Sequence, residues 1–206
     1  MKKPVSEKYK LLDELLKEKI LFLDGAMGTM VQRYKLEEED FRAERFADHD
    51  IDLKGNNDLL CLTRPDVISE IHTQYLSAGS DIIETNTVSA TVISQADYKP
   101  ENIVPELNFE AAKLARTAAD DFMADNPGRK CFVAGALGPT NKTASMSPDV
   151  NNPAYRGVTY DELVNAYYTQ TRSLVQGGVD IILAETTFDT LNLKAAIFGS
   201  EKFLDE

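Results

Sequence analysis

Acidic and small polar residues directly follow the short apolar runs of this sequence. Asp24 and the glycine-rich stretch 25–29 follow the first run, Asn86 lies just after the second, and Glu185 ends the fourth. The third run leads into GALGPTNKT, residues 135–143. In proteins built from parallel strands and helices, functional side chains lie just beyond the carboxyl ends of the strands. These positions are therefore the first candidates for a binding site.

The charges at these positions argue against a phosphate ligand. The sequence has no GxxxxGK[ST] motif, and a phosphate would be repelled by Asp24 and Glu185, with Lys142 as the cation nearby. A zwitterion fits better. The backbone N–H groups of Gly25–Gly28 can hold a carboxylate if they form a nest, Asp24 and Glu185 can hold an ammonium group, and Asn86 can orient either end. The residues thus predict a site for an α-amino acid.

Structural roles compete with this interpretation. Asp24 is of a type that caps turns, and Asp189 of a type that caps helices. Strand alternation favours a structural role for Glu84. The glycines of 135–143 suit either a close approach to a ligand or an ordinary Gly-Pro turn. Glu185 is the stronger ligand candidate, because an acid that ends an apolar run costs free energy without a partner.

Composition excludes several classes of protein. The chain has 206 residues, 43% of them hydrophobic, and a formal net charge of -12. Acids spread along the chain argue against nucleic acid as a partner, and no apolar run approaches a membrane span. The N-terminus lacks a signal-peptide core, so we expect a cytoplasmic protein. His49 and His72 are predicted to be surface or packing residues.

Helix and strand patterns alternate along the chain. Ser6 is a plausible N-cap for a helix over 6–18, and a long polar stretch over 31–60 predicts an elaborated loop with some helix of its own. The junctions YLSAGSDIIETNT and SLVQGGVDIILAETT resemble each other and indicate a repeated unit, although any helix–Gly–strand junction looks similar. The predicted strands are 20–24, 81–86, 131–136 and 179–185. The later helices are predicted over 65–79, 104–124 and 159–178, and from about Asp189 to the end.

These elements predict an α/β fold with parallel βα repeats. Four βα units are few for an open sheet, and a closed (β/α)8 barrel needs eight units in roughly 250 residues. The pattern therefore favours the N-terminal half of a TIM-type barrel, truncated, with a small flavodoxin-like sheet as the alternative. We divide the chain into an N-terminal helix, 1–19, and the first four βα units of the barrel, 20–206.

Six motifs in order resemble one family. They are LDGAMGTM, LKGNNDLL, GSDIIETNT, QADY, FVAGALGPTNKT and VDIILAETTFDT. Together they resemble the N-terminal homocysteine-binding barrel of cobalamin-dependent methionine synthases, from about residue 20 to the end. The resemblance implies that the homocysteine carboxylate lies on the loop of Gly25 and Ala26. It also implies that Asp24 and Glu185 take the amino group, with Asn86 as a neighbour.

The resemblance also implies two cofactors, zinc and cobalamin, whose binding residues we do not find in this sequence. Family members activate homocysteine on zinc held by three cysteines from later strands, which we expect beyond Glu206. Cys61 and Cys131 match none of these ligands, so we assign no metal ligand and no catalytic residue within the chain. The cobalamin- and folate-binding modules are also missing.

The sequence thus predicts the homocysteine-binding part of an enzyme that transfers a methyl group from methylcobalamin to the zinc-activated thiolate of homocysteine. We expect the chain alone to be inactive. One alternative is a non-catalytic amino-acid-binding half-barrel that self-associates through its open sheet edges. Another is a metal-dependent, aldolase-like barrel, which the order of the motifs disfavours.

Overall fold

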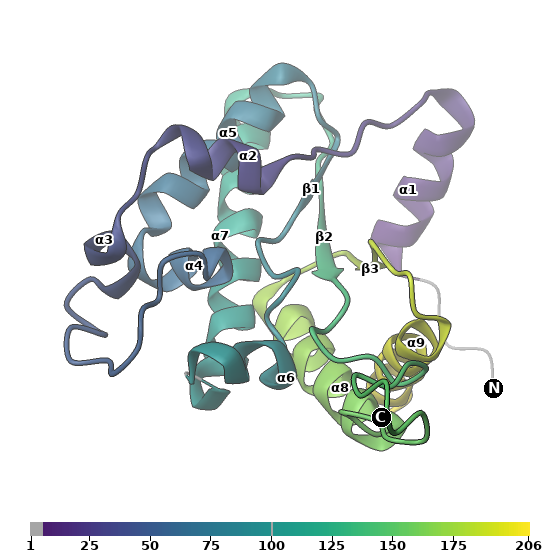
Figure 1. The fold of residues 1–206 in the computed structure, drawn as a ribbon. Helices are drawn as coiled ribbons and strands as arrows, with labels where there is room; N and C mark the ends of the chain where they lie inside the picture. Colours follow the sequence, from purple (N-terminus) through teal and green to yellow (C-terminus); the bar gives the residue numbers. More distant parts are fainter. Residues whose placement is uncertain (1–5, 100) are drawn as a thin grey trace.

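Three parallel strands form the sheet at the centre of this protein. In a computed structural model, which describes residues 6–99 and 101–206, the strands β1 (Ile82–Glu84), β2 (Phe132–Leu137) and β3 (Ile181–Ala184) lie side by side in that order (Figure 1). The first residue of β1 pairs with the first of β2. The central strand β2 is buried along its whole length. Each predicted strand from 81 onward is thus present, in the predicted parallel arrangement.

Helices connect and flank these strands. The α-helices are α1 (Glu7–Glu18), α2 (Met27–Arg33), α3 (Glu38–Arg42), α4 (Leu60–Thr63), α5 (Pro65–Ala78), α6 (Val92–Gln95), α7 (Val104–Asp125), α8 (Tyr160–Gly177) and α9 (Thr190–Leu204). Short 3-10 helices are η1 (Asn57–Leu59), η2 (Ala96–Tyr98) and η3 (Glu101–Ile103). Ser6 caps α1 as predicted, and Thr159 with Glu162 forms the predicted capping box of α8. The first five residues of the predicted segment 1–19 lie outside the described residues.

The long helices form a partial ring around the sheet. Each of α5, α7 and α8 packs against the next long helix, and the series ends at α9 (Figure 1). Ile83 and Val133 are fully buried on the face of the sheet that meets these helices. Glycines allow the closest approach, because a Cβ on Gly199 of α9 would lie 2.6 Å from the Val164 carbonyl oxygen of α8. The core therefore lies between the sheet and its ring of helices.

The prediction of a buried strand over 20–24 is wrong. Only Leu23 forms a bridge, to Ile82, beside β1. Ile20 and Phe22 are 79% and 63% exposed. Backbone hydrogen bonds from Asp81 and Ile82 to the Phe22 carbonyl oxygen hold the segment in the place of an edge strand. The segment is extended but unburied, because it has no second neighbouring strand and no layer over its outer side.

An aspartate at the start of two strands makes the same clamp twice. Asp81 donates its backbone N–H to the Phe22 carbonyl oxygen, and its carboxylate accepts the N–H of Phe22 at 3.0 Å. Asp180 makes both contacts with Val133, again at 3.0 Å for the carboxylate. Lys19 pairs with Asp81, and Arg116 pairs with Asp180. The predicted repeat is thus confirmed, and its aspartates hold neighbouring strands together at their amino-terminal ends.

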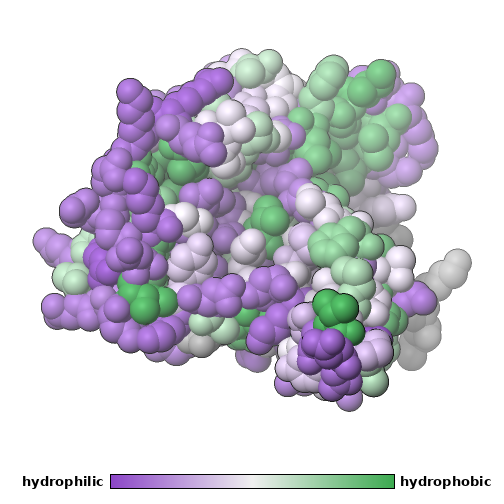
Figure 2. All heavy atoms as spheres, in the orientation of Figure 1, coloured by the Kyte–Doolittle hydropathy of each residue, from purple (hydrophilic) through white to green (hydrophobic). Residues whose placement is uncertain are grey.

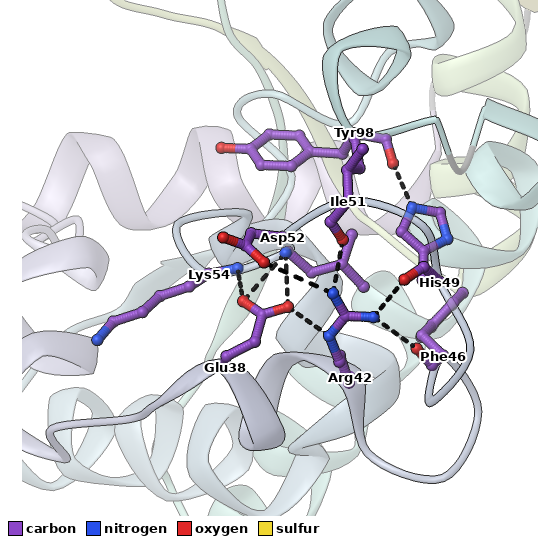
Figure 3. Close-up of polar contacts among 9 residues, drawn as sticks. Glu38, Arg42, Phe46, His49, Ile51, Asp52, Lys54 and Tyr98 are labelled. Carbon is purple, nitrogen blue, oxygen red and sulfur yellow. Dashed lines mark hydrogen bonds and ion pairs between the residues drawn. The ribbon is translucent and has the colours of Figure 1, made fainter.

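The long loop after α2 is held by one arginine (Figure 3). Arg42 forms an ion pair with Glu38 and donates to the backbone carbonyl oxygens of His49 and Ile51. Glu38 in turn accepts two backbone N–H groups, those of Leu53 and Lys54. These contacts fold the loop back on α3 and bring it to the segment 53–59. The prediction of a loop with helices of its own is confirmed by α3, η1 and α4.

The surface has an apolar area around the N-terminal helix. Tyr9 and Leu16 of α1 are exposed, as are Ile20 and Phe22 after it. Figure 2 shows apolar atoms gathered at the upper right, where Figure 1 places α1. Lys8 anchors this helix to the sheet through an ion pair with Asp180. Within the described residues, no helix is long and apolar enough to cross a membrane.

Candidate binding site

A cavity of about 210 Å³ opens at the carboxyl ends of the strands. Its lining comes from the loop after segment 20–24, from the end of β1 and from the residue after β3. All five residues predicted to bind a ligand line this cavity, namely Asp24, Gly25, Ala26, Asn86 and Glu185. The structure therefore brings together side chains that are far apart in the sequence. Met27, Gly28, Glu84, Thr85 and Val88 complete the lining.

The glycine-rich loop turns through a left-handed residue. Ala26 has φ 37° and ψ 38° and immediately precedes α2, whose first backbone hydrogen bond runs from Met30 N to the Ala26 carbonyl oxygen. A left-handed residue followed by a helical one turns successive N–H groups toward the same side. The N–H groups of the first helical turn have no acceptor within the helix. The loop can therefore present amides to an anion, as the sequence predicts.

Asp24 has a structural contact as well as a place in the cavity. Its Oδ1 accepts the backbone N–H of Glu84 at 3.0 Å, and its own N–H donates to the Ile82 carbonyl oxygen. Burial raises the pKa of Asp24 to about 7, and the Glu185 charge adds to the rise, although the Glu84 N–H opposes it. The carboxylate thus secures the end of β1, a structural role different from the predicted turn cap, and it also lines the cavity.

Glu84 lines the cavity together with Asn86, so the argument from strand alternation for a structural role is wrong. Side chains two positions apart in extended backbone point to the same face, so alternation places Glu84 on the side of Asn86 and opposite the neighbours of Asn86. Burial raises the pKa of Glu84 to about 8, and the charges of Glu185 and then Asp24 add to this. Three carboxylates thus share one cavity. The signal that could have identified Glu84 is the short apolar run before it.

Glu185 follows β3 and is anchored through its backbone. Its N–H donates to the Leu137 carbonyl oxygen at 3.1 Å, which extends the pairing of β3 with β2. Its Oε1 is buried without a hydrogen-bond partner in the described structure. The next residue, Thr186, has φ 50°, a left-handed conformation that is costly for a β-branched side chain. A buried carboxylate oxygen without a partner, next to a strained residue, is typical of a ligand site.

Asn86 is fixed by the long loop. Its Nδ2 donates to the Asn57 carbonyl oxygen at 2.7 Å, and its backbone carbonyl accepts from the Cys61 thiol at 3.7 Å. Burial raises the pKa of the Cys61 thiol, and the nearby Asp58 adds to this. Cys61 is therefore a neutral packing residue behind the cavity. Asn86 faces the cavity in an orientation that the residues of LKGNNDLL set.

The LKGNNDLL motif and the segment after β1 are joined by buried polar contacts. Asn56 and Gln95 exchange two side-chain hydrogen bonds, of 2.7 and 3.1 Å. Asp58 accepts the backbone N–H of Ser89 at 3.1 Å, and burial raises its pKa to about 6. Gln95 also donates to the Ser89 carbonyl oxygen. These contacts hold residues 86–89 in place, so the motif positions the site without lining it.

Other sequence candidates have structural roles. Asp189 caps α9 by accepting from the N–H groups of Leu191 and Asn192, and it also accepts from Ser145. A Cβ on Gly138, in the segment 135–143, would lie 2.4 Å from the Val88 carbonyl oxygen, so this glycine permits backbone contact within the chain. His49 bonds the Tyr98 carbonyl oxygen, and His72 is fully buried in α5.

Comparison with known proteins identifies the family. The model of the family described as Homocysteine S-methyltransferase matches residues 21–205. The chain belongs to the homocysteine S-methyltransferase family. Structures of the homocysteine methyltransferase MmuM from Escherichia coli are similar to it. The metallated form matches with a TM-score of 0.70 and 22% identity, over 94% of this chain and 62% of that one. The apo form matches with a TM-score of 0.65 and 20% identity, over 94% and 59%.

The fold prediction is confirmed by these matches. The parallel βα repeats are those of the N-terminal half of a (β/α)8 barrel. This chain spans about three fifths of the MmuM chain, since it covers 62% of it. Family membership therefore applies to the residues present, which include the cavity at the carboxyl ends of the strands.

The described cysteines do not fit the zinc site that the resemblance implies. Cys61 is buried in α4, and Cys131 immediately precedes β2, at the opposite end of the strand from the cavity. Within 6–99 and 101–206, no three His, Cys, Asp or Glu residues are grouped so that they could hold a metal ion. Structural zinc takes four protein ligands and catalytic zinc three. We therefore derive no step through zinc from these residues.

Proposed function

We propose that this chain forms the homocysteine-binding half of a homocysteine S-methyltransferase barrel. The observation that carries the proposal is one cavity lined by the Gly25–Ala26 loop, Asp24, Asn86 and Glu185, in a chain of this family. The loop amides would hold the α-carboxylate, and the carboxylates would hold the α-ammonium group. A neutral or anionic ligand without an ammonium group would leave the acids unpaired, so the site favours an amino acid.

The contribution of these residues is binding and orientation. With both ends of the amino acid fixed at the strand ends, its side chain would extend away from the loop and the acids. Fixing a reactant in one orientation lowers the entropic part of a barrier. The zinc that would activate the homocysteine thiol would be held by other residues, and we propose that the chain alone transfers no methyl group.

Within the family, we propose the cobalamin-dependent methionine synthase branch. The support is the order of the six sequence motifs, of which LKGNNDLL and GALGPTNKT favour this branch. Methylcobalamin would then be the methyl donor, with cobalamin- and folate-binding modules as the partners. A cytoplasmic location belongs to the same proposal.

A binding experiment tests the amino-acid site. We expect L-homocysteine to bind the chain in a calorimetric titration, and Glu185→Ala to weaken the affinity about tenfold or more, because a charged hydrogen bond is worth about 1.5–3 kcal/mol. Glu44→Ala is the matched control, since Glu44 is exposed and far from the cavity lining. Equal affinities for Glu185→Ala and Glu44→Ala would refute the ammonium role.

A second candidate function is favoured by the exposed apolar edge. Ile20, Phe22 and Leu23 lie beside β1 and are 79%, 63% and 43% exposed. Unpaired strand edges promote association between chains. The chain could thus act as a non-catalytic half-barrel that binds an amino acid and associates with itself.

A further inference from the structure

The cavity of the candidate site contains more negative charge than an ammonium group needs. Asp24, Glu84 and Glu185 come from three different segments and line the same space. Among the described residues that line it, none carries a positive charge. The inference that follows rests on the proposed function, since it concerns the group that would bind the amino end of the ligand.

The three carboxylates are not equivalent. Asp24 already accepts the N–H of Glu84, so part of its charge is stabilised by the backbone. Glu84 projects from β1 on the face opposite Ile83, whose side chain is fully buried against the helices. Glu185 has a buried oxygen, Oε1, without a hydrogen-bond partner. Glu185 accepts from the Thr186 hydroxyl at 3.5 Å, and a side-chain hydrogen bond joins Glu84 to Glu185, but no cation among the described lining residues offsets their charge.

The charged surroundings of this pair are all acidic on the cavity side. Asp24 and Glu185 both repel a charge on Glu84. Tyr75 of α5 faces Asp24, and Arg33 at the end of α2 acts on Tyr75 rather than on the glutamates. Neighbouring carboxylates in a half-buried site cannot all ionise at low cost. A proton shared within the site is the simplest way to lower that cost.

We propose that Glu84 holds a proton in the ligand-free site, beside the carboxylate of Glu185, and that the ammonium group of a bound amino acid takes the place of this proton. The exchange balances without any other reactant. The O–H bond of the carboxyl group breaks, the proton passes to the solvent buffer, and the arriving N–H groups donate to the carboxylate oxygens. Glu84 is thereby a specificity-determining residue for an α-ammonium group.

The ligand-free chain provides the first test. The pKa of Glu84, raised to about 8, exceeds its ordinary value of 4.5. The folded chain then binds more protons than the unfolded chain between these pH values, so the free energy of unfolding falls as pH rises from 5 to 8. We expect Glu84→Gln to be more stable than wild type at pH 8, and the difference to shrink as pH falls to the ordinary pKa of 4.5 and below. The free energy of unfolding of Glu84→Gln should still fall somewhat with rising pH, because the pKa of Asp24 is also raised, to about 7. Glu44→Gln, at an exposed position, should leave the whole profile unchanged.

Ligand binding provides the second test. L-homocysteine and its thiol-free analogue L-homoserine would be titrated at pH 7 in phosphate and in Tris, whose ionisation enthalpies differ. We expect release of up to about one proton per ligand for both. L-homoserine cannot release a thiol proton, so its signal reports the carboxyl pair. The analogue 4-hydroxybutyrate, which lacks the ammonium group, should release none. Glu84→Gln should bind L-homoserine with a smaller proton release than wild type.

The outcomes separate this inference from the proposed function. Binding of both amino acids without proton release would overturn the proton exchange and leave the amino-acid site intact. A wild-type stability profile identical to that of Glu84→Gln would also overturn the exchange. Failure of the wild-type chain to bind either amino acid would overturn the proposed function and the exchange together, whereas the stability profiles would still decide whether Glu84 holds a proton in the ligand-free chain.

Discussion

Thr186 stores strain next to the residue proposed to bind the ammonium group. Its φ of 50° places a β-branched side chain in the left-handed region, which costs about 1–2 kcal/mol. Ala26, on the other side of the cavity, has φ 37°. Both loops of the cavity therefore depend on the surrounding structure to hold a costly backbone conformation. Strain of this kind orients the neighbouring carboxylate and amides before a ligand arrives.

We expect Thr186→Gly to raise the free energy of unfolding by about 1 kcal/mol, because glycine adopts positive φ without strain. Urea denaturation measures the change. Thr187→Gly is the matched control, since Thr187 is not among the residues at positive φ and donates to the Glu185 carbonyl oxygen. It should lower stability. A loss of stability in Thr186→Gly equal to that of the control would contradict the strain argument.

His72 makes the stability of the chain sensitive to acid. The ring lies fully buried in α5, and neither nitrogen has a hydrogen-bond partner in the described structure. Burial lowers the pKa of His72 to about 4, below its ordinary 6.5. Between these values the unfolded chain binds more protons, so the stability present above pH 6.5 is lost as pH falls toward 4.

We expect His72→Leu to be less sensitive to acid than wild type, because leucine fills much of the same space and cannot be protonated. Thermal unfolding of both proteins between pH 4 and pH 8 checks this. The stability of the variant relative to wild type should be greatest near pH 4. Parallel curves across the whole range would show that His72 does not titrate in this window.

At the scale of elements, the packing of α8 and α9 depends on one glycine. A Cβ on Gly199 would lie 2.6 Å from the Val164 carbonyl oxygen and 3.0 Å from the Tyr168 backbone nitrogen. Backbone atoms cannot move aside as a flexible side chain can. The two helices must therefore separate to admit even a methyl group. Their contact buries Leu163 and Ala196 in one core cluster, so a separation would disturb that cluster as well.

We expect Gly199→Ala to lower the free energy of unfolding by about 1–3 kcal/mol. Helix propensity alone predicts the opposite, a gain of about 1 kcal/mol, so the sign of the effect is decisive. Gly157→Ala is the control, because a Cβ there has nothing nearer than 3.9 Å. Chemical denaturation of both variants distinguishes the two explanations, and a stabilised Gly199→Ala would rule out the close contact.

The elements predictable from sequence are those whose signals are local. Ser6 and Thr159 mark helix starts by their side chains, and Gly79 and Gly178 mark helix ends that need positive φ. The rule that sites follow strands was enough to group Asp24, Asn86 and Glu185. The segment 20–24 was misjudged, because burial depends on neighbours that an apolar run does not specify. The position of Glu84 in the cavity is predictable, because side chains two positions apart share a face and Glu84 therefore lies on the side of Asn86.

At the scale of the whole molecule, the described residues cover one side of the sheet incompletely at β1 and β3. The residues of segment 20–24 that would be core in a closed sheet are exposed, and the inner faces of β1 and β3 are only half-buried. A chain of this length that leaves several large apolar side chains exposed near one edge favours association. The formal net charge of -12 opposes it.

We expect sedimentation velocity to detect association of the chain that increases with salt, because salt screens the repulsion between acidic chains. Phe22→Ser should reduce it, since Phe22 is 63% exposed at the edge. Val150→Ser is the control, because Val150 is 94% exposed but lies in the loop before α8. A monomeric wild-type chain at high concentration and high salt would refute self-association.

The clamp of Asp81 and the site residue Glu84 lie only three positions apart, at opposite ends of β1. Asp81 is paired with Lys19 and secures the sheet, whereas Glu84 lies among other acids and lines a cavity. Asp180 and Glu185 bracket β3 in the same way. The length of each strand therefore determines which acid lies at the clamped end and which lies at the cavity. A single inserted or deleted residue within either strand would reach both ends at once, whereas a substitution at the cavity end leaves the other end intact. Variation in this part of the chain is thus expected to proceed by exchange of residues and not by change of length.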